Sequence, residues 1–160
     1  MPALRLPAVD PASVPEKIGS PFPEPFRSRL RARSKRRLGD ACGLRQLGVN
    51  LVTIPPGGES ALRHWHTLED EFVYMLSGEL VLITDEGEQT LTTGMCAGYP
   101  ARTRNAHHMV NRGREPATYL EVGSRVEGDA AFYPDDDLMW IEREDGRTVV
   151  HKDGTPYPGG

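Results

Sequence analysis

The chain has 160 residues, 38% of them hydrophobic and 26% charged, which fits one soluble globular domain and excludes a wholly disordered chain. The formal net charge is −4, and 17 glycines and 14 prolines against 7% aromatic residues favour short strands over long helices. No run of about 18 apolar residues occurs and the first residues do not resemble a signal peptide, so we expect a cytoplasmic protein that enters no membrane. An all-β fold is therefore predicted.

Residues 1–40 are predicted to form an extended N-terminal arm, because seven prolines within residues 1–26 exclude a regular helix or a central strand. Residues 27–37 carry seven of the chain's 19 basic residues and no acidic one, so the remaining 12 face 23 acidic residues. We interpret this basic stretch as a solvated face, or one paired with a neighbouring subunit, in preference to a nucleic-acid contact. The arm has no core of its own, and we expect it to lie across a second copy in a homodimer.

Residues 41–128 are predicted to form a barrel or sandwich of antiparallel strands. Strand-like runs rich in β-branched and aromatic residues, with turn signals between them, occupy residues 46–54, 71–76, 79–84, 89–93, 106–110 and 117–122. Residues 129–160 form an irregular C-terminal segment in this prediction. Its apolar run Leu138, Met139, Trp140 and Ile141 is expected to pack on the barrel.

Two histidines and a glutamate form a candidate metal site. His64 and His66 are two residues apart, so on a strand both rings project from one face. Glu71 follows a polar stretch that can turn the chain back, and it opens an apolar strand. Two imidazoles and a carboxylate suit iron, manganese, nickel or zinc with positions left open. Glu69 and Asp70 compete for the carboxylate role, and the alternative is a set of exposed polar residues around a turn.

The pattern GxxxxxHxHxxxxExxxxxxG from Gly58 to Gly78 resembles the first motif of the cupin superfamily without a departure. A second cupin motif, GxxxxxPxGxxHxxxN, is matched at Gly94, Pro100, His107 and Asn111. It departs at Arg102, where glycine is expected, and two extra residues precede the histidine. The resemblance spans roughly residues 40–125 and implies a double-stranded β-helix, the jelly-roll barrel.

Carried over by position, the resemblance implies metal ligands at His64, His66, Glu71 and His107. His107 and His108 are adjacent, so on a strand they face opposite ways and only one reaches the barrel interior. The spacing to Asn111 favours His107. A shift of one residue caused by the insertion would swap the two faces.

Stretches such as HWHTLEDEFVYML, AHHMVN and HKDGTPYP are similar to a group of small single-domain bacterial cupins labelled sugar-phosphate isomerases. This resemblance implies one divalent Zn, Mn, Fe or Ni ion that acts as a Lewis acid on a small polar ligand and stabilises an enediolate during proton transfer. The alternatives are an Fe(II)-dependent dioxygenase and a non-catalytic metabolite-binding or regulatory cupin. The sequence does not choose among them, nor does it identify the metal or the substrate.

An isomerase needs a base, and Glu121 on the predicted strand 117–122 is the candidate by residue type, with a surface carboxylate as the alternative. A phosphate group would need cationic donors. Arg63, Arg102 and Arg104 are close in sequence to the proposed ligands and are the candidates, with a position on the rim as the alternative.

Overall fold

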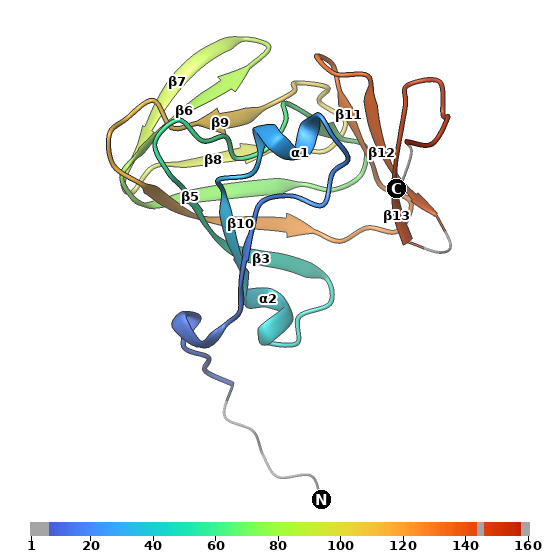
Figure 1. Cartoon of the computed structure of the whole chain (residues 1–160). Helices are drawn as coiled ribbons and strands as arrows, with labels where there is room; N and C mark the ends of the chain where they lie inside the picture. Colours follow the sequence, from blue (N-terminus) through green and yellow to red (C-terminus); the bar gives the residue numbers. More distant parts are fainter. Residues whose placement is uncertain (1–6, 144–145, 158–160) are drawn as a thin grey trace, which may run out of the picture.

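The computed structural model describes residues 7–143 and 146–157, and its strands form three sheets closed into the jelly-roll barrel that the sequence predicted (Figure 1). The six-stranded sheet runs in the order β1 (Glu16–Ile18), β2 (Ser34–Arg37), β3 (Leu47–Ile54), β10 (Ala117–Ser124), β5 (Glu71–Ser77) and β8 (Cys96–Tyr99). The three-stranded sheet contains β7 (Gly87–Thr92), β6 (Glu79–Thr84) and β9 (His108–Val110). The four-stranded sheet contains β13 (Gly146–Val150), β12 (Leu138–Arg143), β11 (Ala130–Tyr133) and β4 (Trp65–His66).

Helical structure is sparse in the described residues. It consists of a 3-10 turn, η1 (Pro11–Ser13), and two α-helices of four residues each, α1 (Phe26–Arg29) and α2 (Leu38–Ala41). None of the described helices is long and apolar enough to cross a membrane.

All six predicted runs lie in strands, with small changes at their ends, as β3, β5, β6, β7, β9 and β10. The alternation of side chains explains their burial. On β5, Val73 and Met75 face the core, whereas Phe72, Tyr74 and Leu76 lie on the outer face with about two fifths of each side chain exposed. The inward residues of several strands meet in one cluster: Val52, Ile54, Val73, Met75, Leu80, Leu82, Leu91, Met109, Ala117 and Tyr119.

The glycine that closes the first motif is required by its neighbours. Gly78 has a φ of 74°, and a Cβ at this position would lie 2.8 Å from the Cα of Ala117 and from the carbonyl oxygen of Pro116. Both the left-handed backbone and the close approach of β10 therefore demand glycine at the turn between β5 and β6.

The N-terminal segment differs from the predicted extended arm in that part of it joins the barrel of its own chain. Strand β1 pairs with β2, and β2 pairs with β3, so residues 16–37 extend the six-stranded sheet of their own barrel. Phe26 and Leu30 are buried against Leu138 and Trp140. Prolines limit this segment to short helices and strands, but its apolar side chains still pack into a core with the C-terminal strands. Among the described residues of this segment, those before β1 run away from the barrel in Figure 1.

The C-terminal segment is also more regular than predicted. Strands β11, β12 and β13 pair antiparallel, and β11 pairs with β4, which carries His66. Leu138 and Trp140 are buried, as expected for residues packed on the barrel, while Met139 and Ile141 alternate with them and are half-buried. The strands join the barrel directly beside the candidate metal ligands.

Candidate metal centre and adjoining pocket

A single carboxylate organises the turn that brings His66 and Glu71 together. Asp129 lies in the loop before β11 and is 1% exposed. Its Oδ1 accepts hydrogen bonds from the backbone N–H groups of Leu68 at 2.7 Å and Glu69 at 3.2 Å. Two otherwise unpaired backbone donors are thereby satisfied, and the chain reverses between the two ligand positions.

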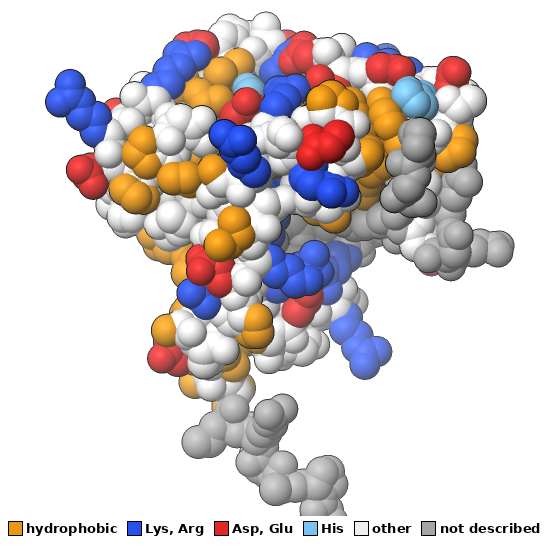
Figure 2. All heavy atoms as spheres, in the orientation of Figure 1, with side chains coloured by type: hydrophobic (Ala, Val, Ile, Leu, Met, Phe, Trp, Pro, Cys, Tyr) orange, Lys and Arg blue, Asp and Glu red, His pale blue; other side chains and the backbone are white. Residues whose placement is uncertain are grey.

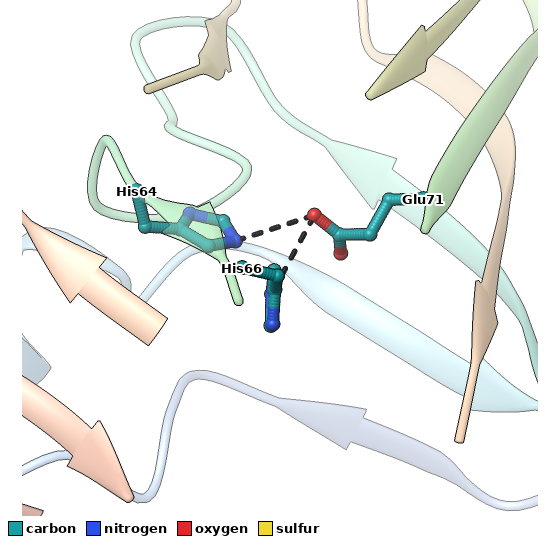
Figure 3. A group of neighbouring side chains, drawn as sticks. All are labelled: His64, His66 and Glu71. Carbon is teal, nitrogen blue, oxygen red and sulfur yellow. Dashed lines mark ion pairs between the residues drawn. The ribbon is translucent and has the colours of Figure 1, made fainter. Parts of the chain in front are cut away.

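Three imidazoles converge on one oxygen of Glu71. The Nε2 atoms of His64, His66 and His107 lie 3.5, 3.6 and 3.0 Å from Glu71 Oε2. Figure 3 shows His64 and His66 on one side and the Glu71 carboxylate, from the start of β5, pointing toward them. Ligand atoms of His64, His66 and Glu71 all lie within 4.8 Å of one another, and His107 is not part of that group. The structure thus brings together all four residues that the resemblance implied.

The second ring nitrogens of two of these histidines are already engaged. His64 Nδ1 lies 2.7 Å from the carbonyl oxygen of Leu62, and His66 Nδ1 lies 2.6 Å from Asp129 Oδ2. Both partners are acceptors, so each Nδ1 carries the proton and each Nε2 keeps a lone pair for a metal. These acceptors had no recognisable signal in the sequence.

The choice between His107 and His108 follows from the backbone register. His107 exchanges backbone hydrogen bonds with His64, and its side chain is buried in the site. His108 turns the other way, and its Nδ1 lies 3.1 Å from the carbonyl oxygen of Ala61. The His107 ring is stacked on Tyr99 with centroids 3.5 Å apart. The structure therefore places His107 rather than His108 among the candidate ligands.

The two-residue insertion before His107 is absorbed in the loop between β8 and β9. Arg102, which stands where the motif has glycine, has a φ of 66°, and Arg104 has a φ of 55°. Left-handed backbone costs a non-glycine residue about 1 kcal/mol. The loop accommodates the extra length in this conformation, so the strand beyond it keeps the register that the motif requires.

The competing carboxylates serve other contacts. Glu69 Oε1 accepts the backbone N–H of Val126 at 3.1 Å, and Asp70 Oδ1 accepts that of Ala101 at 2.7 Å. Glu69 also lies with His66 and Asp129 in a second group of metal-compatible side chains. Asp129 in that group already accepts four hydrogen bonds from protein donors. The group is therefore better described as the support of the His66 ring.

The protonation states of Glu71 and His107 suit a metal, whereas a metal would have to compete with a proton at His66. Burial opposes the charged form of His66, but the hydrogen bond to Asp129 and the charge of Glu71 outweigh burial and raise the pKa of His66. Burial opposes ionisation of Glu71, but its interactions with the rings of His107 and His64 outweigh burial and hold the pKa of Glu71 well below its usual value. Burial lowers the pKa of His107, which keeps that imidazole neutral. Three imidazoles with one carboxylate form a donor set for a divalent transition metal. The donors, their convergence and the fixed tautomers of two rings all fit such an ion.

A pocket of about 290 Å³ adjoins the metal donors and contains Glu121. Glu121 lies on the inward face of β10, two residues from the core residue Tyr119. Its Oε1 accepts hydrogen bonds from Lys35 Nζ at 2.7 Å and Asn50 Nδ2 at 2.9 Å. Burial opposes its ionisation, but the Lys35 ammonium prevails and lowers the pKa of Glu121. It is thus an ionised carboxylate of the pocket wall, not of the outer surface.

The cationic wall of this pocket was missed by the sequence analysis. It consists of Arg33, Lys35, Arg37 and Arg125. Three of these belong to the stretch 27–37, which we interpreted as a solvated or intersubunit face. Their spacing of two residues was the available signal, because alternate residues of a strand share one face. Pairing of β2 with β3 then turns that face toward the barrel mouth.

The three arginines proposed from sequence proximity lie outside the pocket lining. Arg63 is held by Asp85 and by Asp135, whose carboxylate oxygens lie 2.7 and 2.8 Å from Arg63 nitrogens. The exposed Arg102 directs its Nε to a backbone carbonyl oxygen, and the Arg104 guanidinium lies 5.8 Å from the ring centre of Trp65. Arg63 precedes β4, and Arg102 and Arg104 lie in the loop between β8 and β9, so closeness to the ligands in sequence does not bring their side chains to the pocket wall.

Residues 50–123 match the family described as "Cupin domain". A crystal structure of a sugar phosphate isomerase from a cupin superfamily, from Silicibacter pomeroyi, is 44% identical, with 96% of this chain and 98% of that chain covered and a TM-score of 0.90. A crystal structure of a protein described as "Putative sugar phosphate isomerase", from Acidithiobacillus ferrooxidans, is 31% identical, with 81% of this chain and 82% of that chain covered and a TM-score of 0.71. A polyketide cyclase from Streptomyces resistomycificus shares the fold alone, at 20% identity, 75% and 80% coverage and a TM-score of 0.61. No curated protein matches the chain.

Proposed function

The chain belongs to the cupin superfamily, and from that premise we propose that it is a metal-dependent isomerase acting on a small sugar-phosphate-like substrate. The observation that carries this proposal is the shared pocket. One wall holds three of the candidate metal ligands, His64, His66 and Glu71, and another holds Glu121, an ionised carboxylate that is not among them. The two similar proteins named for sugar phosphate isomerisation support the substrate class.

His64, His66, Glu71 and His107 would hold one Zn, Mn, Fe or Ni ion. When bound, the ion would supply Lewis-acid polarisation of a substrate carbonyl. The residues contribute the rigid donor set: the His66 ring is fixed by Asp129 and the His64 ring by a backbone carbonyl. A donor set held in this way orients a substrate without further rearrangement.

Glu121 is the proposed proton acceptor. In an aldose–ketose interconversion a proton leaves the hydroxyl-bearing carbon beside the carbonyl, a proton is added to the former carbonyl carbon, and a hydroxyl proton passes between the two oxygens. The Glu121 carboxylate takes the first proton and returns it to the neighbouring carbon. Lys35 and Asn50 act as positioning residues, because both donate to the same Glu121 oxygen.

The test is isotope exchange. Protein loaded in turn with Zn, Mn, Fe or Ni is incubated with aldose and ketose phosphates in D₂O, and NMR follows interconversion and deuterium uptake beside the carbonyl. We expect Glu121→Gln to lower the exchange rate by about 100-fold or more while metal content is unchanged. Glu86→Gln, at an exposed turn, is the matched control and retains full exchange.

Each other outcome contradicts one part of the proposal or supports one of the alternative functions. Exchange that survives in Glu121→Gln removes Glu121 from the proposed mechanism. Consumption of dioxygen by the iron-loaded protein, without isomerisation, supports the dioxygenase alternative. Metal content that is unchanged in both His64→Ala and Glu71→Ala means that the metal site is wrong. Metal binding with no turnover of any kind supports the non-catalytic cupin.

A further inference from the structure

The cationic wall of the pocket has a regular origin in one strand. Arg33, immediately before β2, and Lys35 and Arg37 within it line the pocket. The alternate residue Arg36 faces away and contacts Glu16 and the backbone of Val14. Figure 2 shows Lys and Arg side chains gathered in the region that α2 and β3 occupy in Figure 1. The inward face of β2 is therefore cationic, because the alternate residues Arg33, Lys35 and Arg37 share it.

The acidic partners do not neutralise this wall. Lys35 is paired with Glu121 at 2.7 Å. Arg37 and Arg125 share one carboxylate, that of Asp40. Among the lining residues, the four cations of the wall face the three carboxylates of Glu69, Glu71 and Glu121, so the lining carries a formal charge of +1 with its histidines neutral. A divalent ion at the metal donors would make the pocket more positive still.

Arg33 is the clearest uncompensated charge of the wall. Its Nη1 donates to the carbonyl oxygen of Ser60 and its Nε to that of Gly19. Among the side chains that the structure describes, no carboxylate lies within ion-pair distance of it, although the side chain is half-buried and its charge helps to lower the pKa of Glu121. A guanidinium carries five N–H donors in a planar fork that suits oxyanions, and only two are used. A half-buried cation of this kind is stabilised by an anion.

Two glycines keep the space between this wall and the metal donors open. Gly48 on β3 and Gly123 on β10 are register partners, and both line the pocket. A Cβ on Gly48 would lie 3.6 Å from Arg125 Nε, and one on Gly123 would lie 3.9 Å from Glu71 Cγ. Any larger side chain would project between the cations and the metal donors. The glycine pair leaves one path that reaches both.

We propose that Arg33, Arg37 and Arg125 form an anion subsite that binds the phosphoryl group of a phosphate monoester, with the other end of the ligand at the metal donors. The inference rests on the proposed function, and it identifies the residues that would select a phosphorylated substrate. A phosphate monoester carries about two negative charges at neutral pH, so it can pair with two cations of the wall at once. A carboxylate carries one charge and leaves the other cation unpaired.

Inorganic phosphate is the probe, titrated calorimetrically into metal-free and metal-loaded protein at fixed ionic strength. We expect Arg33→Gln and Arg125→Gln each to weaken phosphate binding at least tenfold in both forms. Arg36→Gln removes the same charge from the opposite face of β2 and leaves the affinity within twofold. Circular dichroism and thermal unfolding show whether each variant is folded, and the two subsite variants provide independent tests.

Two results would overturn the subsite: no binding of millimolar phosphate to the wild type, or an equal loss in Arg36→Gln, which would mean unspecific charge attraction. A separate arm compares a sugar phosphate with the unphosphorylated sugar as competitors. Phosphate binding through Arg33 in a protein that turns over nothing would refute the isomerase and leave the subsite. Isomerisation of unphosphorylated sugars, without inhibition by phosphate, would refute the subsite and leave the isomerase.

Discussion

Replacing Asp129 by asparagine tests whether the support of a single ring controls metal binding. The Oδ1 of Asp129 accepts three hydrogen bonds from residues 67–69, so the asparagine oxygen is expected to stay on that side. Its NH₂ group then replaces Oδ2 and faces His66 Nδ1, which was 2.6 Å from an acceptor. A donor in that place forces the proton of His66 to Nε2. The nitrogen that points at the metal donors is then protonated.

The expected loss of metal affinity in Asp129→Asn follows from the number of ligands that the substitution affects. Three of the four donors remain, and removing the outer partner of a ligating histidine lowers metal affinity by about 10–100-fold, or about 1.4–2.7 kcal/mol. Competition with a chromogenic chelator at pH 7.5 measures this difference for Zn or Mn. The matched control is Asp135→Asn, which removes a carboxylate from the exposed pair with Arg63 and leaves metal affinity unchanged.

The unfolding of the metal-free proteins separates support from stability. We expect Asp129→Asn to unfold as cooperatively as the wild type, because an oxygen still accepts the backbone donors of the turn. Metal affinity within twofold of the wild type would refute the tautomer argument. Loss of cooperative unfolding together with metal binding would mean that Asp129 holds the fold and that His66 is affected only through it.

Three further outcomes follow from other contacts. Lys35→Met removes the strongest interaction that opposes the burial of Glu121, so the pKa of Glu121 rises and the acid limb of kcat/KM moves to higher pH. In the wild type this lowered pKa stabilises the fold above about pH 4.3, and the stabilisation is lost as the pH falls further. We therefore expect Lys35→Met to flatten the fall of the unfolding free energy with decreasing pH. An unchanged slope would argue against the Lys35–Glu121 pair. Phe26→Ala is expected to cost about 3 kcal/mol in urea unfolding because Phe26 is 6% exposed, with Val9→Ala, 39% exposed, as control; a cost below about 1 kcal/mol would mean that the segment does not stabilise this barrel. Light scattering is expected to give twice the chain's 17.7 kDa for the predicted homodimer, and a mass near 17.7 kDa would reject it.

The strands and the trio of ligands were predictable because they depend on local periodicity. The two-residue spacing of His64 and His66 sets both rings on one face, and the turn after them returns the chain to Glu71. The alternation of side chains along a strand did not by itself decide whether His107 or His108 faces the metal site. That choice depended on how the loop containing Arg102 absorbs two additional residues, which is a matter of backbone conformation that the sequence does not display.

The features that the sequence did not predict depend on contacts between distant segments. Asp129 lies 63 residues from His66, and Arg33 lies 27 residues from Ser60, whose carbonyl it contacts. Neither pair is marked by a local pattern. The N-terminal segment was misjudged for a related reason: prolines exclude long regular elements, but they do not prevent a side chain such as Phe26 from entering a core formed by the C-terminal strands.

The inward faces of three neighbouring strands change from polar to apolar at one level of the barrel. Paired inward residues of β3, β10 and β5 form successive layers: Gly48, Gly123 and Glu71; then Asn50, Glu121 and Val73; then Val52, Tyr119 and Met75. The third layer is buried core, whereas the first lines the pocket. Because strand pairing fixes this order, a substitution in the first layer alters what the pocket binds, and one in the third alters the stability of the walls. Glu121 lies at the boundary, where a charge is buried deeply enough to need Lys35 yet still reaches the pocket. A carboxylate one layer deeper would face only apolar neighbours and lose its charge, and one layer outward it would lose the partners that hold it.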